Sequence, residues 1–260
     1  MANNVITQAG FRSGVAYEYD GLTFETCVSS APFYFGDEFV GAGHQAGIPA
    51  AGSPAAGYPW VKKIVGSGPP TATIPSNSVG GQLQVALVST SEAEEASVYF
   101  NDSTSIPTLG TSIGQAEWRS QLGVAPTLSA QAFLGLGSAW VGGPLNLARY
   151  IGFLWNGSAG LSLISKDGNG DTYSLTAAPI GGSAITTDTT LFHIYRVDWS
   201  NQADVRFYVD GNPVNAPNTV VWNPSSTANG VLQPWHTVYK ASGAGLATLN
   251  VDKIDVFTNR

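Results

Sequence analysis

Charge is scarce in this chain of 260 residues, because only 11% of them are Asp, Glu, Lys or Arg, against ~25% in an average globular protein. The charges that are present sum to −7 at neutral pH. A nucleic-acid-binding surface needs clustered Lys and Arg, and Lys62–Lys63 is the only adjacent basic pair. We therefore expect no nucleic-acid partner.

Cysteine is almost absent, since Cys27 is the only one, and a single thiol excludes an internal disulfide. No apolar run approaches the ~20 residues that a helix needs to cross a bilayer, so we expect no membrane partner. The first ten residues lack the basic start and apolar stretch of a secretory signal. Together these absences predict a protein that is made and kept in a cytoplasm until it is assembled or released.

Helical periodicity is also missing, and period-two alternation takes its place. It is clearest at residues 191–212, where β-branched and aromatic residues alternate with others on both sides of a short polar segment, residues 200–203. This pattern is typical of two strands. Residues 210–212, Asp-Gly-Asn, favour a tight turn because Gly and Asn tolerate positive φ. The stretch therefore predicts a β-hairpin with a second turn attached.

Other short stretches with the same alternation predict at least a dozen strands in total. They lie at residues 33–41, 60–65, 81–88, 96–100, 114–122, 130–139, 149–155, 161–165, 173–175, 230–241 and 247–258. Residues 41–57 and 66–78 are rich in Gly, Ala or Pro without periodicity, which predicts long loops. Residues 91–95 form an acidic cluster at a turn, where we expect solvated side chains. The fold class that follows is an all-β, two-sheet antiparallel sandwich.

The hairpin also resembles a known pattern, H-x-Y-x-x-x-W followed by I-x-F-Y-V-D-G, which is typical of concanavalin A-like lectin/glucanase jelly rolls. The matching residues are His193, Tyr195, Trp199, Phe207, Tyr208, Val209, Asp210 and Gly211, with Val205 in place of the Ile. Further matches to strands of that superfamily are Asp37, Phe39 and Gly41, then Gly114, Glu117 and Arg119, then Val251, Asp252, Ile254 and Val256. The resemblance implies a jelly-roll domain over residues 33–260 and leaves residues 1–32 outside it as an N-terminal arm.

The same superfamily contains laminarinase-type glycoside hydrolases, which carry their catalytic carboxylates on one strand as Glu-x-Asp-x-x-Glu. Retaining hydrolysis needs the two carboxyl groups about 5–5.5 Å apart. In the order of the matching strands, that strand falls at residues 148–155, which contain no carboxylate. We therefore expect no catalytic residues and no enzymatic activity, and glycoside hydrolysis is the third and least favoured hypothesis.

Metal and cofactor sites are not predicted. Residues 167–171 resemble the start of a calcium loop, but the Glu required at position twelve is Ala178. The three histidines have no ligand spacing, and fingerprints for phosphate or dinucleotide binding are absent. We expect no cofactor.

A second resemblance concerns residues 60–66, 231–243 and 247–260. They are similar to lectin-like jelly-roll proteins that are encoded with the head genes of tailed phages and are thought to decorate or cement the outer capsid, usually as trimers. The resemblance implies a structural protein made in the host cytoplasm and located on the capsid surface of the virion. Its partners would be the major capsid protein and copies of itself in a homotrimer.

The arm fits such an assembly role on energetic grounds. Fixing ~30 residues costs about 1–2 kcal/mol for each residue, and the arm has few large apolar side chains to offset that cost. We expect a neighbouring subunit to order it. The candidate assembly contacts are Phe11, Tyr17, Tyr19 and Phe24.

The alternative function is a non-catalytic, lectin-like carbohydrate-binding module, which a virion could also carry and which would bind host surface glycans. Aromatic faces stack on sugar rings, and the candidate stacking residues are Trp140, Trp155 and Trp235. The competing interpretation for each is core packing, because sandwich cores use large aromatic side chains routinely.

Overall fold

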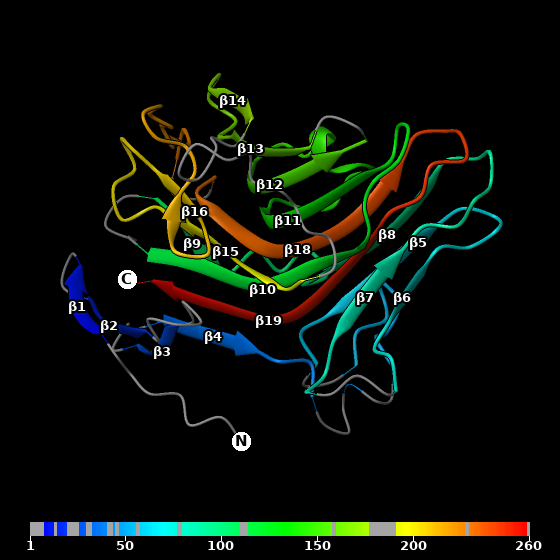
Figure 1. Ribbon diagram of the computed structural model, residues 1–260, viewed down its shortest axis with the longest axis horizontal. Coiled ribbons are helices and arrows are strands. Elements are labelled where there is room, and N and C mark those ends of the chain that lie inside the picture. The colour runs from blue at the N-terminus through cyan, green and yellow to red at the C-terminus, as the bar shows by residue number, and fades with distance from the viewer. Residues whose placement is uncertain are drawn as a thin grey trace.

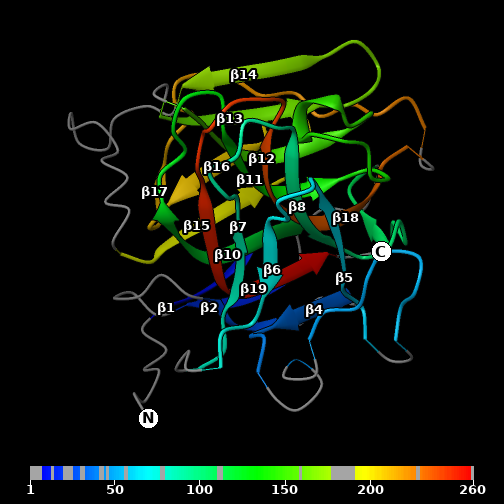
Figure 2. The same cartoon turned by 90° about the vertical axis from the view of Figure 1, so that its right-hand side faces the viewer.

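The computed structural model describes residues 8–12, 15–19, 26–29, 33–40, 44, 47–55, 58–76, 80–109, 114–157, 160–176, 191–226 and 229–258. Almost all regular structure among them is β-strand (Figures 1 and 2). One 3-10 helix, η1 (Pro144–Asn146), interrupts the strands. In this part of the chain, no helix is long and apolar enough to span a membrane.

The described residues form nineteen strands. They are β1 (Gln8–Arg12), β2 (Val15–Tyr19), β3 (Thr26–Ser29), β4 (Phe33–Asp37), β5 (Val61–Val65), β6 (Thr71–Thr73), β7 (Leu83–Ala86), β8 (Glu94–Tyr99), β9 (Ile106–Pro107), β10 (Gly114–Val124), β11 (Gln131–Gly137), β12 (Tyr150–Asn156), β13 (Leu161–Lys166), β14 (Thr172–Thr176), β15 (His193–Asp198), β16 (Arg206–Val209), β17 (Asn212–Pro213), β18 (Val231–Lys240) and β19 (Thr248–Thr258).

Two eight-stranded antiparallel sheets make up the sandwich. The β19 sheet has the order β17-β16-β15-β10-β19-β7-β6, with β4 also paired to β19. The β18 sheet has the order β14-β13-β12-β11-β18-β8-β5, with β9 also paired to β18. Figure 1 shows β14, β13, β12 and β11 following one another toward β18. This architecture confirms the predicted all-β, two-sheet fold class.

The core lies between the two sheets, and alternate residues of every long strand point into it. In the predicted hairpin, Val197 pairs with Phe207, and both are fully buried. Burying one such side chain contributes roughly 1.5–3 kcal/mol. The turn after β16 has positive φ at Asp210 and Gly211, as the tight-turn pattern predicts. The fully buried tryptophans that fill the sandwich between the sheets are Trp60, Trp118, Trp199 and Trp222.

His236 is an unusual member of this core. Its imidazole is fully buried against Trp60, with the ring centroids 5.2 Å apart. Neither ring nitrogen has a hydrogen-bond partner among the described residues. Burial lowers the pKa of His236 to about 3, because the apolar surroundings disfavour the charged form.

Two local predictions are wrong. The predicted loop at residues 66–78 contains a short strand, β6, which pairs with β7. The acidic cluster is also not solvated throughout, because two of its three acidic residues, Glu94 and Glu95, lie in β8 and are 0% and 1% exposed. Their burial depends on partners that come from distant parts of the chain.

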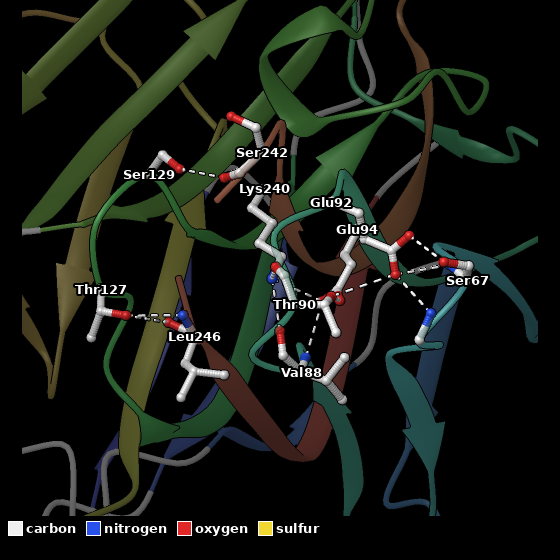
Figure 3. Close-up of polar contacts among 11 residues, drawn as sticks. Ser67, Val88, Thr90, Glu92, Glu94, Thr127, Ser129, Lys240, Ser242 and Leu246 are labelled. Atoms are coloured by element: carbon white, nitrogen blue, oxygen red, sulfur yellow. Dashed lines mark hydrogen bonds and ion pairs between the residues drawn. The ribbon is translucent and has the colours of Figure 1, made fainter. Parts of the chain in front are cut away.

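Glu94 points between the sheets toward Lys240, and we call this pair the Lys240–Glu94 clamp (Figure 3). The ammonium of Lys240 lies 3.3 Å from the carboxylate, and both side chains are fully buried. It donates to the carbonyl oxygens of Val88 and Thr90, each at 2.7 Å. Glu94 accepts from the backbone N–H of Val88 at 3.0 Å. The clamp thus holds the turn where the chain passes from β7 in one sheet to β8 in the other.

Glu92 fastens the same turn to a neighbouring loop (Figure 3). Its carboxylate accepts from the hydroxyl of Ser67 at 2.6 Å and from the backbone N–H groups of Ser67 and Gly68 at 2.9 and 2.7 Å. These hydrogen bonds, led by the Ser67 hydroxyl, lower the pKa of Glu92 to about 2.

The strands β1 to β3 form a separate three-stranded sheet that pairs with neither large sheet within the described residues. Figure 1 places it beside β4. The side chains of Phe11, Tyr17 and Tyr19 lie outside what the structure describes, and so does the whole of Phe24. Their role as assembly contacts stays a prediction.

The clamp yields a stability prediction. Replacing Lys240 with Met leaves Glu94 buried without its counter-ion, which costs about 3–5 kcal/mol. Urea unfolding of Lys240→Met should show this loss, while Lys62→Met, at a half-buried position on β5, should change the unfolding free energy by less than about 0.5 kcal/mol. Equal effects of the two substitutions would contradict the clamp.

His236 yields a pH prediction. The unfolded chain protonates this histidine below about pH 6.5, whereas the native state keeps it neutral down to about pH 3. The unfolded state therefore binds more protons than the native state in this window. As a result, His236 lowers the free energy of unfolding by up to ~1.4 kcal/mol for each unit that the pH falls. The advantage of His236→Met over the parent should grow between pH 6.5 and 4 in urea unfolding. If the unfolding free energies of parent and variant change with pH in parallel, His236 takes up its proton at the same pH in the native state as in the unfolded chain.

Candidate functional site

The outer face of the β18 sheet, which is turned away from the β19 sheet, is where β12 would present catalytic carboxylates. The outward residues of β12 are Tyr150, Gly152, Leu154 and Asn156, as the pairing register places them in rows with Trp235 and Phe133. None carries a carboxylate, so this strand lacks the acid–base pair of the laminarinase-type pattern.

Two glycines meet in the middle of this face. Gly135 on β11 lies opposite Gly152 on β12 in the pairing register. A Cβ atom on Gly152 would lie 2.4 Å from the carbonyl oxygen of Leu134 and 2.7 Å from the Cα of Gly135. The two strands therefore approach as bare backbone at this point.

A second apolar cluster covers much of the outer face. Residues 138–149, which connect β11 to β12, contribute to it through Leu147, which is fully buried. Its members are Val61, Tyr99, Phe133, Leu147, Tyr150, Leu154, Ile164 and Trp235.

Two of the three candidate stacking residues are buried, each on a different face of the β18 sheet. Trp235 belongs to the outer cluster and is 0% exposed, because the β11–β12 connection covers it. Trp155 points between the sheets and is 2% exposed, with its ring edge-on to Tyr195 at 5.2 Å. Neither ring offers a face to a sugar.

Trp140 is the third candidate, and it stays half-buried in the β11–β12 connection. Its indole N–H donates to Glu95 at 2.9 Å, and its backbone N–H donates to Asp102 at 2.6 Å. The ammonium of Lys63 lies 4.9 Å from the ring centroid. The ring is therefore held in one orientation beside a cation at an accessible position.

Glu95 on β8 binds the β11–β12 connection through hydrogen bonds to Trp140 and Gly143. Its carboxylate is 1% exposed and also accepts from the Ser97 hydroxyl and, at 3.1 Å, from the backbone N–H of Gly143. Burial raises the pKa of Glu95. Gly143 has a φ of 83° and packs on Tyr239, where a Cβ would lie 2.9 Å from the ring, so only glycine suits the position.

A polar cavity lies at the turn between β15 and β16, and we call it the hairpin cavity. Its volume is about 150 Å³, and its lining consists of Asp198, Ser200, Asn201, Asp204 and Arg206. Arg206 forms an ion pair with one carboxylate oxygen of Asp204. The other oxygen of Asp204, Oδ1, is buried and has no hydrogen-bond partner among the described residues. The sequence shows only a polar turn here, since a cavity needs side-chain directions that alternation does not give.

His44 takes part in a hydrogen-bonded chain rather than in a metal site. It lies 2.7 Å from the hydroxyl of Tyr58 and 3.1 Å from Asp37, which also accepts from the indole N–H of Trp60 at 2.6 Å. Burial, with the charge of Asp37, raises the pKa of Tyr58 to about 12, so its phenol stays protonated. Among the described residues, no group of three or more His, Cys, Asp or Glu side chains is placed to hold a metal ion.

Comparison with known proteins gives the fold of this chain. No protein-family model and no curated protein matches it. A protein of unknown function from Shewanella oneidensis MR-1 has a TM-score of 0.53 at 12% identity, over 91% of this chain and 90% of that one. A β-1,3-glucanase from Mycobacterium marinum has a TM-score of 0.51 at 17% identity, over 88% and 100%. A glycoside hydrolase family protein from Mycobacterium thermorestibile has a TM-score of 0.50 at 17% identity, over 86% and 99%.

These likenesses support the two-sheet antiparallel β-sandwich as the fold of this chain. At such identities they define the fold and leave the activity to be argued from the residues of the site.

Proposed function

We propose that this protein is a carbohydrate-binding module without glycosidase activity, and that Trp140 is part of its sugar-binding surface. The observation that carries the proposal is the fixed, half-buried ring of Trp140. It is the one candidate tryptophan of the three that keeps accessible surface. Glu95 accepts from its indole N–H and Asp102 from its backbone N–H.

The surroundings of the ring suit a sugar. A ring that is already held in place loses little conformational freedom on binding, which favours affinity. Lys63 lies over the ring, and its long, flexible side chain can turn to donate hydrogen bonds to hydroxyl groups. Tyr239 is half-buried beside Gly143 and adds a second aromatic ring.

The chemistry of the outer face supports binding without hydrolysis. Most glycoside hydrolases cleave the glycosidic bond with two carboxyl groups that flank it. The outward positions of β12 supply none. Glu95 is buried under Trp140, and three donors already occupy its oxygens.

Trp140 therefore gives a binding prediction. On the glycan that a glycan array identifies as the tightest ligand, Trp140→Ala should weaken binding about 30-fold or more, as for a central aromatic contact worth ~2 kcal/mol. Trp140→Phe keeps an aromatic face and should retain most of the affinity. Titration calorimetry measures both.

Two outcomes would count against this proposal. Unchanged affinity in Trp140→Ala, with a parental far-ultraviolet spectrum, would remove Trp140 from the binding surface. Release of reducing sugar from β-glucan by the parent protein would restore the hydrolase hypothesis.

A second candidate function is decoration of a tailed-phage capsid, with the major capsid protein and two further copies of this chain as partners. The observation that favours it is the three-stranded sheet β1 to β3, which pairs with neither sheet of the sandwich within the described residues. Three strands are near the lower limit for a sheet that is stable by itself, so a further surface to pack on would stabilise it. A neighbouring subunit on the virion surface can provide one.

Deletion of residues 2–30 tests this second candidate. The two large sheets keep all their strands in the deleted protein, so it should fold but fail to join assembled particles. Protein inventories of purified particles measure the occupancy. Full occupancy without these residues would exclude the arm as the anchor and leave the loops at residues 41–57 and 66–78 as the contact surface.

A further inference from the structure

We propose that the hairpin cavity binds one neutral sugar residue through two adjacent hydroxyl groups, at a site separate from Trp140. The inference rests on the proposed carbohydrate-binding function, to which it adds a second site and a ligand class. The cavity belongs to the β19 sheet, whereas Trp140 lies over the β18 sheet.

The hairpin builds the cavity on its outer side. Val197 and Phe207 point into the core, so their neighbours Asp198 and Arg206, which are register partners, point to the opposite face. Asp198 ends β15 and is fixed by Ser200, which donates to it through its backbone N–H at 2.9 Å and through its hydroxyl. The lining is thus anchored to the strands.

The charges of the lining favour a neutral ligand. Two carboxylates, Asp198 and Asp204, repel an anion such as phosphate. The guanidinium of Arg206, already paired with Asp204, opposes a free cation. A ligand without net charge avoids both penalties.

The hydrogen-bonding groups favour adjacent hydroxyls. The Oδ1 atom of Asp204 is a buried acceptor that lacks a donor among the described residues. Arg206 has five N–H donors in a planar fork, and Ser200, which donates to Asp198, keeps lone pairs for accepting. A hydroxyl group both donates and accepts, so two neighbouring hydroxyls can donate to Asp204 and Ser200 while they accept from Arg206.

The size of the cavity limits the ligand to one unit. Its volume of about 150 Å³ exceeds by far the ~10–15 Å³ that one water molecule needs. It is well below the ~300–1,000 Å³ of sites that enclose drug-sized ligands. A single sugar ring, such as the end of a glycan chain, fits this range.

The experiment uses the full chain and a panel of methyl glycosides of glucose, galactose, mannose and xylose, followed by amide NMR shifts. At least one glycoside should shift the signals of Ser200, Asn201 and Asp204 at millimolar concentration. Asp204→Asn, which changes the acceptor, should weaken that binding at least 10-fold. The matched control Asp171→Asn, at an exposed carboxylate on another loop, and Trp140→Ala should leave it unchanged.

The outcomes separate this inference from the proposed function. Shifts confined to the surroundings of Trp140, or parental affinity in Asp204→Asn, overturn the hairpin site and leave the carbohydrate-binding proposal standing. Shifts at the hairpin with calcium chloride or sodium phosphate instead of glycosides overturn the neutral ligand. Shifts at the hairpin with loss of the Trp140 effect support the inference and refute Trp140. If no glycoside and no arrayed glycan binds, both proposals fail.

Discussion

The fold depends on two opposite charges that are sealed from water at the turn between β7 and β8. Removing Lys240 and Glu94 from solvent costs several kcal/mol for each ion, and this cost is offset because the turn backbone supplies partners to both. The Lys240–Glu94 clamp is connected to the candidate site by two neighbouring residues of β8. Glu94 points between the sheets, and the next residue, Glu95, points outward to Trp140. The buried pair that fixes the turn thus also fixes the strand that orients the accessible tryptophan.

Alternation was enough to predict the longer strands of the two large sheets, the hairpin at residues 191–212 and the sandwich, because each sheet buries one face of its strands against the other. It missed short strands such as β6. Alternation did not predict which residues the β11–β12 connection buries on the outer face of the β18 sheet. Trp235 lies on the face opposite the core, yet residues 138–149 cover it. The sequence around Trp235 does not predict this burial. Glu94 and Glu95 were expected in solvent because an acidic run is usually solvated. The partners that bury them, Lys240 and Trp140, are distant in sequence.

The candidate site was predictable in part. Trp140 was named from its residue type and its place beside a strand, but its support by Glu95 and Asp102 depends on three-dimensional contacts. The hairpin cavity could not be foreseen, because it is lined by polar side chains of a turn whose directions alternation does not give. The two proposed functions use different parts of the molecule. One protein could therefore both join a capsid and bind glycans.

The facing glycines of β11 and β12, Gly135 and Gly152, limit which side chains the middle of this sheet can accept. Gly152 lies at an outward position of β12, the strand on which the resemblance to laminarinase-type hydrolases would place the catalytic carboxylates. A side chain there would collide with the backbone of β11 at Leu134 and Gly135, and backbone atoms cannot rotate away as side chains do. Gaining a carboxylate at this point therefore requires the two strands to move apart, which no single substitution achieves. The steric barrier to such a change lies in the middle of the sheet, where backbone meets backbone.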